Sequence, residues 1–164
     1  MYTYHPVVEI LVKSFGTTPQ SLEPLHEQLL AYRENTEGLK EAMLKHKVTG
    51  ESEFQQALAA YYELEYRDNF NDVPVVREFT EFIPIRYAKK NIFFPLKKTR
   101  NTLEVAITNP ELSQPLDDLA RHFKCHIQSV ISHKQAVLDL INRAYDESSA
   151  STEDAVDLLD SEET

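Results

Sequence analysis

The chain has 164 residues, enough for one ordinary domain or two small ones, and at 41% hydrophobic it can bury a core. Its formal net charge of −10 argues against general binding to nucleic acids or anionic membranes, although a local basic patch is compatible with it. Cys125 is the only cysteine, which rules out an intramolecular disulfide and favours a reducing compartment.

The sequence of the N-terminal half predicts a small bundle of three or four helices between residues 4 and 65. Apolar residues recur at helical spacing in several short runs, most clearly over residues 54–61. Thr18 and Asn35 stand where helix caps are expected. One helix is predicted over residues 19–32, because Pro24 falls close enough to its first turn to be tolerated.

The organisation predicted along the chain is two subdomains. Residues 1–67 form the helical subdomain, and residues 68–78 are a linker, since they lack periodicity and contain several turn formers. Residues 79–145 form an α/β subdomain. Residues 146–164 hold eight Asp or Glu and no Lys or Arg, so we expect this acidic segment to be mobile.

The sequence of the second subdomain predicts a three-stranded sheet with helices, in the order helix, strand, strand, helix, strand, helix. The strands are residues 92–99, 102–108 and 126–131, and the middle one alternates apolar and polar side chains. Residues 116–123 carry an apolar stripe at helical spacing. Ser132 and Gln135 have the spacing of a capping box, which is expected to begin the last helix. The predicted fold class is therefore α+β, a helical bundle followed by a small sheet.

Catalytic motifs are missing from the sequence. There is no G-x-x-x-x-G-K-[ST] loop to cradle phosphates and no G-x-S-x-G nucleophile elbow, so the chain is not expected to hydrolyse ATP. His122, Cys125, His126 and His133 are residue types that suit zinc, but neighbours in a strand point to opposite faces. We prefer to interpret them as ordinary residues of a helix–strand junction, with Cys125 inert and buried.

A run of basic residues is the most informative feature. Six cations and no acid lie between positions 86 and 100: Arg86, Lys89, Lys90, Lys97, Lys98 and Arg100. One interpretation is a solvated helix end and hairpin. The other is a docking surface for an acidic partner, or for the acidic segment of the chain itself, with Tyr87, Phe93 and Phe94 as apolar anchors. No nucleic-acid-binding module accompanies these residues.

Four short motifs occur in order in the second half. They are P-x-x-x-A-K-K at residues 84–90, A-x-x-N-P at 106–110, P-L-D-D-L at 115–119 and R-A-Y at 143–145. Together with residues 52–68 and the acidic segment, they make the chain resemble the N-terminal region of the type II secretion ATPases, GspE, and their type IV pilus assembly relatives. No single motif is diagnostic, but the ordered set covers most of the chain.

The resemblance implies a non-catalytic docking region that recruits its ATPase to the inner membrane by binding the cytoplasmic domain of a GspL-type membrane protein. ATP and Mg²⁺ would then be bound by a catalytic part that follows the acidic segment. A bacterial cytoplasmic protein, at the membrane only indirectly, is expected. A related branch binds cyclic di-GMP through paired R-L-G-x-x-L motifs, but here the matching positions, 6–8 and 38–40, lack both the arginine and the glycine.

Overall fold

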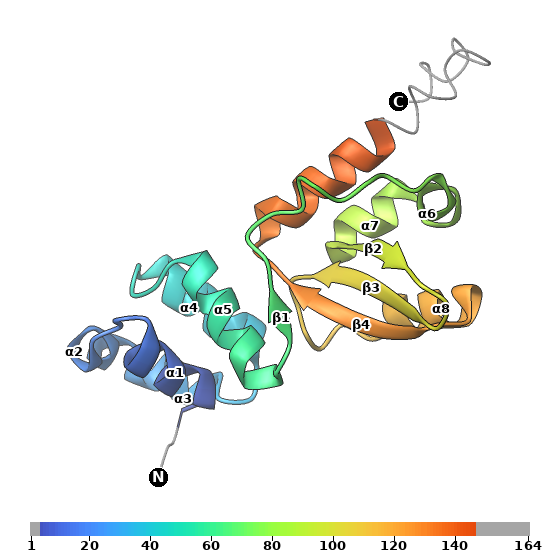
Figure 1. The fold of residues 1–164 in the computed structure, drawn as a ribbon. Helices are drawn as coiled ribbons and strands as arrows, with labels where there is room; N and C mark the ends of the chain where they lie inside the picture. Colours follow the sequence, from blue (N-terminus) through green and yellow to red (C-terminus); the bar gives the residue numbers. More distant parts are fainter. Residues whose placement is uncertain (1–3, 147–164) are drawn as a thin grey trace. The chain divides into compact units, whose positions relative to one another are not determined.

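The computed structural model describes residues 4–146, which divide into two compact units (Figure 1). The first unit contains residues 4–68 together with 131–133, and the second contains residues 69–130 and continues from 134. The class expected from the sequence, α+β, is confirmed. Within residues 4–146, no helix is both long enough and apolar enough to pass through a bilayer. The acidic segment lies outside the described residues, except for Asp146.

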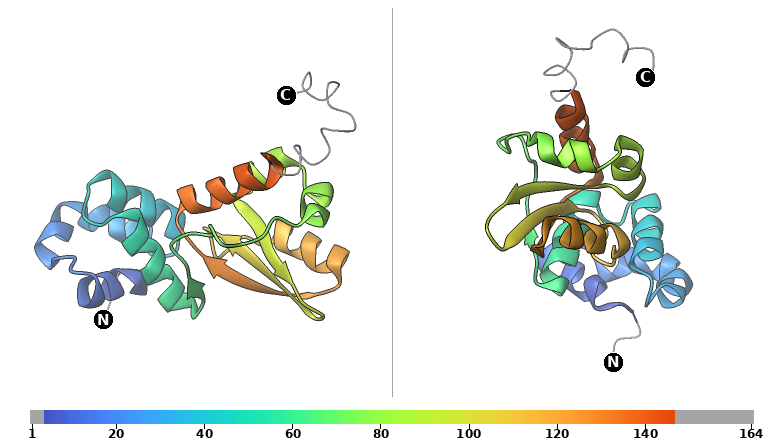
Figure 2. Two further views of the ribbon diagram at one scale, coloured as in Figure 1. Left: turned by 45° about the horizontal axis from the view of Figure 1, so that its top comes forward. Right: turned by 90° about the vertical axis from the view of Figure 1, so that its right-hand side faces the viewer.

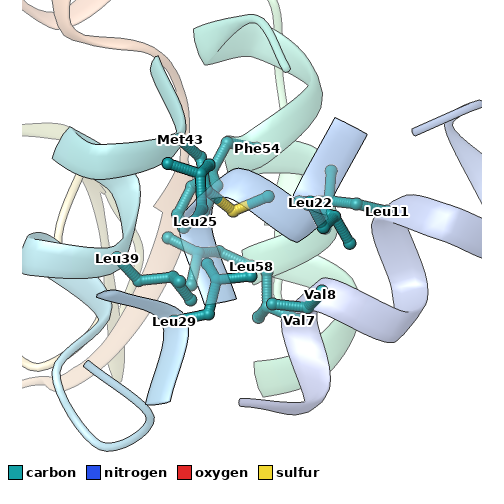
Figure 3. Packing of buried hydrophobic residues seen from close by; sticks show 11 residues of the cluster. Val7, Val8, Leu11, Leu22, Leu25, Leu29, Leu39, Met43, Phe54 and Leu58 are labelled. Carbon is teal, nitrogen blue, oxygen red and sulfur yellow. The ribbon is translucent and has the colours of Figure 1, made fainter. Parts of the chain in front are cut away.

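Short helices make up most of the first unit. Their bounds are α1 Pro6–Ser14, α2 Pro19–Leu22, the 3₁₀ turn η1 Glu23–Leu25, α3 His26–Ala31, α4 Thr36–Lys45 and α5 Glu51–Tyr62. Figure 3 shows how side chains from these helices meet in one core that includes Leu11, Leu29, Met43, Phe54 and Leu58, all of them fully buried. Each short helix buries one apolar face against the others, so the bundle is stabilised by this common hydrophobic core and not by helix propensity.

Side-chain caps set where these helices begin. Thr18 accepts from the Ser21 amide and places Pro19 at the first position of α2, and Asn35 accepts from the Gly38 amide to begin α4. The single helix predicted over residues 19–32 is wrong. Pro24 has no amide hydrogen to donate, and the chain passes through η1 before it resumes as α3.

The second unit is built on a sheet. Its elements are α6 Arg77–Phe82, α7 Ile85–Asn91, β2 Phe93–Lys98, β3 Thr102–Ile107, α8 Gln114–Phe123, β4 His126–Ile131, and a closing helix that begins at residue 134 and is described as far as residue 146. β2 and β3 form an antiparallel hairpin, whereas β3 and β4 run in the same direction with α8 as the crossover between them. Figures 1 and 2 show α8 and the closing helix on opposite faces of the sheet.

Core aromatic residues connect these layers. Phe94 of β2 points to the face covered by the closing helix, where its ring centroid lies 5.7 Å from that of Tyr145. The preceding residue, Phe93, faces the other way and packs at 5.6 Å against Tyr87. Both phenylalanines are buried, as a strand covered on both faces requires, so the prediction that they anchor a partner is wrong.

Three features differ from the sequence-based expectations. The sheet has four strands in the order β1-β4-β3-β2, because Glu65–Tyr66 forms an additional strand, β1, too short to show any alternation. The hydroxyl of Ser132 donates to the carbonyl of Arg67, a long-range bond that the capping-box spacing did not predict. The stretch 69–76, expected within a linker, holds two buried side chains, Phe70 and Val73.

Candidate functional site

The β2–β3 hairpin presents three of the predicted cations. Lys97 and Lys98 are the last two residues of β2 and Arg100 lies in the tight turn that follows, and all three are exposed. The turn is closed by the Thr99 amide, which donates to the carbonyl of Thr102 at 2.8 Å. We call Lys97, Lys98 and Arg100 the basic hairpin.

A bulge explains why two consecutive lysines face solvent. Pro95 pairs with Val105 but Lys97 pairs with Glu104, so Leu96 is an extra residue in β2. The insertion changes the alternation of side chains, and the burial of β2 becomes four buried residues followed by two exposed ones. Pro95 is tolerated because β2 is an edge strand, where a missing amide hydrogen breaks no ladder on the open side.

An open pocket of about 560 Å³ lies beside the basic hairpin. Apolar side chains form much of its lining, and the full set is Pro74, Val76, Glu78, Phe79, Leu96, Lys97, Lys98, Thr99 and Arg100. Three cations and one carboxylate give the lining a net charge of +2. This hairpin pocket thus combines an apolar surface with a positive border, which suits a ligand that carries both apolar and acidic groups.

The other cations of the predicted surface do not line this pocket. Arg86, Lys89 and Lys90 are exposed on α7. Tyr87, predicted as an apolar anchor on the same surface, is half-buried and donates to Asp118 of α8 at 3.3 Å. Partial burial, and secondly the Asp118 carboxylate, raise the pKa of Tyr87 above its usual value. The structure therefore gathers three of the six predicted cations around one pocket.

None of the six cations makes an ion pair with a residue in the described range 4–146. Basic residues elsewhere do: Lys13 pairs with Glu9, Lys40 with Glu51 and Arg121 with Asp118. The cations at 86–100 thus keep their charge available in a molecule that is strongly acidic overall.

The residues considered as zinc ligands have other surroundings. His122 stacks on Phe82 with ring centroids 3.7 Å apart, and Cys125 is buried with its thiol toward the carbonyl of Phe123. His126 is exposed at the start of β4, and His133 contacts the carbonyl of Asp68. In the part of the chain that is described, no three His, Cys, Asp or Glu side chains converge as metal ligands would.

The pocket residues that sequence reasoning missed come from residues 74–79. Pro74 and Val76 lie in the stretch predicted as a linker, and Phe79 lies in α6. A usable signal was present, since the apolar residues of this stretch are too many for a solvated linker. The approach of this stretch to the hairpin is a tertiary contact that no local pattern encodes.

The positions matched to R-L-G motifs lie in the first unit. Val7 and Val8 are buried in α1, and Leu39 is buried in α4. Lys40 stands where the second motif has glycine, and its ammonium group binds Glu51 at 3.2 Å. Neither position supplies a guanidinium group.

Comparison with known proteins gives the family. A family model described as the MshEN domain matches residues 62–151. The chain belongs to the MshEN domain family. The type IV pilus assembly ATPase PilB of Myxococcus xanthus (strain DK1622) is 25% identical over 148 residues, which cover 90% of this chain and 25% of PilB. The chain therefore corresponds to a quarter of this curated relative.

Solved structures share the fold of this MshEN-family chain. A structure of MshE with cdg superposes with a TM-score of 0.64 at 18% identity, covering 85% of this chain and 98% of that one. The N-terminal domain of XpsE superposes with a TM-score of 0.60 at 17% identity, covering 84% and 92%. These findings confirm the resemblance to the N-terminal regions of secretion and pilus assembly ATPases that the sequence predicts.

Proposed function

We propose that this chain is a non-catalytic docking domain of a secretion or pilus assembly ATPase, and that it recruits the ATPase by binding the cytoplasmic domain of a GspL-type inner-membrane protein. The basic hairpin and its pocket are the proposed contact. Catalysis, with ATP and Mg²⁺, is assigned to a separate part of the ATPase. Membership of the MshEN family and the likeness to PilB support the ATPase context.

One observation carries the docking proposal: three cations that form no ion pair within residues 4–146 border an open apolar pocket on a protein of net charge −10. Exposed charges accelerate encounter with an oppositely charged partner and fix its orientation. The accessible part of the apolar lining, Pro74 and Val76, supplies surface whose burial stabilises the complex once it has formed. The expected contact on the partner is therefore an acidic stretch that carries one or two apolar side chains.

The test is calorimetric titration of this chain with the cytoplasmic domain of the cognate membrane protein, at low and at physiological salt. The hairpin variant Lys97→Glu/Lys98→Glu/Arg100→Glu is expected to bind at least about tenfold more weakly, because three rim charges become repulsive. The α7 variant Arg86→Glu/Lys89→Glu/Lys90→Glu shows whether the helix also contributes.

A matched control is available in the first unit. Arg33, Lys45 and Lys47 are exposed, and reversing them to Glu changes the net charge by the same amount. Equal losses in the hairpin variant and in this control would mean that only net charge matters, which would contradict the proposed site. Undetectable binding of the unmodified chain at both salt concentrations would contradict recruitment itself.

Cyclic di-GMP sensing is the alternative function. The likeness to the structure of MshE with cdg, which covers 98% of that chain, favours it. The residues at 6–8 and 38–40 oppose it, because without arginine there is no bidentate donor for a phosphate or a base edge. Titration with cyclic di-GMP, monitored by calorimetry and thermal unfolding, decides between the two. We expect no heat of binding and no rise in melting temperature, and saturable binding would make sensing the preferred function.

A further inference from the structure

We propose that the acidic segment of the chain itself binds in the hairpin pocket and competes there with the partner. This inference rests on the site of the proposed function and assigns that site an occupant from the same chain. The stretch that fits is residues 153–160, Glu-Asp-Ala-Val-Asp-Leu-Leu-Asp.

Chemical complementarity is the first argument. The stretch carries four carboxylates and no cation, and among them lie three large apolar residues, Val156, Leu158 and Leu159. The hairpin pocket has the opposite pattern, an apolar floor with three cations on its border and only Glu78 opposing them. The volume of about 560 Å³ is within the range of sites that hold a ligand of several side chains.

Reach is the second argument. Tyr145, in the last described turn of the closing helix, is anchored because its hydroxyl donates to the carbonyl of Ile83 and its ring packs against Phe94. Phe94 in turn packs at 6.3 Å against Phe79, which lines the pocket, so Phe79 lies within about 12 Å of the Tyr145 ring. Seven residues lie between Tyr145 and Glu153, and the eight steps from one to the other span up to about 28 Å. The stretch 153–160 can therefore reach the pocket of its own molecule.

The tether makes weak contacts effective. A ligand joined by a short linker acts at a local concentration on the order of millimolar, so even modest affinity keeps the pocket occupied. A partner must then displace the segment, and its apparent affinity falls in proportion to the fraction of molecules with a free pocket. The acidic segment would thereby set the threshold for docking.

The experiment uses the whole chain and reads both sides of the contact by NMR. The variant Glu153→Gln/Asp154→Asn/Asp157→Asn/Asp160→Asn removes the charges of the stretch, and Leu158→Ser/Leu159→Ser removes its apolar pair. We expect each variant to shift the backbone amides of Lys97, Lys98 and Arg100. In the reciprocal measurement, the hairpin variant Lys97→Glu/Lys98→Glu/Arg100→Glu shifts the amides of residues 153–160, whereas the Arg33→Glu/Lys45→Glu/Lys47→Glu control does not.

Several outcomes overturn the inference. Hairpin amides that stay unchanged in both segment variants would exclude binding in the pocket, and so would segment amides that respond equally to the hairpin variant and to its control. Shifts that vanish on tenfold dilution would mean that the segment binds a second copy and not its own molecule.

Partner titration separates this inference from the proposed function. If the segment occupies half to nine-tenths of the pockets, neutralising its four carboxylates raises the apparent affinity for the membrane partner about twofold to tenfold. Partner binding with no change in the neutralised variant would overturn the inference and leave docking intact. Amide shifts without any partner binding would support the inference and contradict the docking proposal.

Discussion

Arg143 is predicted to hold one wall of the hairpin pocket in place. From the closing helix, its guanidinium group donates to the carbonyl of Phe70 at 2.7 Å and to that of Val73 at 2.9 Å. These carbonyls belong to the stretch that continues into Pro74 and Val76, which line the pocket. Replacing Arg143 with Ala removes both bonds, and the stretch is then held by the burial of Phe70 and Val73 and by its own local hydrogen bonds.

The expected cost follows from these two bonds. A hydrogen bond from a charged donor contributes about 1.5–3 kcal/mol, so Arg143→Ala should lower the free energy of unfolding by about 3 kcal/mol. For a chain of this size, that is a fall in melting temperature of about 6–12 °C. Arg143→Lys keeps the charge but has no planar fork to reach two carbonyls at once, so it should lose roughly half as much.

Urea unfolding followed by circular dichroism measures the free energy, and hydrogen exchange at the Val73 amide, which donates to Phe70, reports on the stretch locally. Arg121→Ala is the matched control, because Arg121 forms an exposed ion pair with Asp118 that should contribute less than about 1 kcal/mol. A loss below about 0.5 kcal/mol for Arg143→Ala, with unchanged exchange at Val73, would refute the reasoning.

Three further predictions test other parts of the fold. Tyr145→Phe should cost about 1 kcal/mol by removing the donor to the Ile83 carbonyl. Burial also raises the pKa of Tyr145, so above about pH 10 the native state keeps a proton that the unfolded state loses. The contribution of Tyr145 to the free energy of unfolding is therefore full below about pH 10 and falls above it by up to about 1.4 kcal/mol per pH unit. Alkaline unfolding titrations of the variant should show a shallower fall. In the first unit, Leu29→Ala should cost about 2–5 kcal/mol in urea unfolding, whereas the exposed neighbour Gln28→Ala should stay within about 0.5 kcal/mol; equal effects would contradict the assigned core. The buried thiol of Cys125 should react slowly with a disulfide reagent in the native protein and rapidly in urea, and fast native labelling would place it at the surface.

The elements of the sheet follow closely from local sequence. The strand expected over residues 126–131 is observed with those bounds, and the one expected over 102–108 differs by a single residue. Period-2 alternation identifies such strands because each presents one face to a core. Caps such as Thr18 and Asn35 were equally readable, since a cap is a bond between residues only three apart.

Other features needed partners distant in the chain. Ser132 has the spacing of a capping box, yet that spacing gives no sign that its hydroxyl donates to the carbonyl of Arg67, 65 residues away. Glu65–Tyr66 is a strand only because another strand is available to pair with it. A short sequence pattern indicates which hydrogen bonds a residue is able to form, and the tertiary structure decides which of the possible partners it binds.

The candidate site shows the same division. Sequence alone determined that six cations lie between positions 86 and 100, that no acid accompanies them, and that an acidic segment exists elsewhere in the chain. Tertiary structure decided which cations act together: the bulge at Leu96 turns both Lys97 and Lys98 to solvent, and the stretch containing Pro74 and Val76 packs beside them. Charge is a property of each residue and can be counted along the chain. A pocket is an arrangement of surfaces that come from separate segments, and it exists only once burial of residues such as Phe79 has brought those segments together.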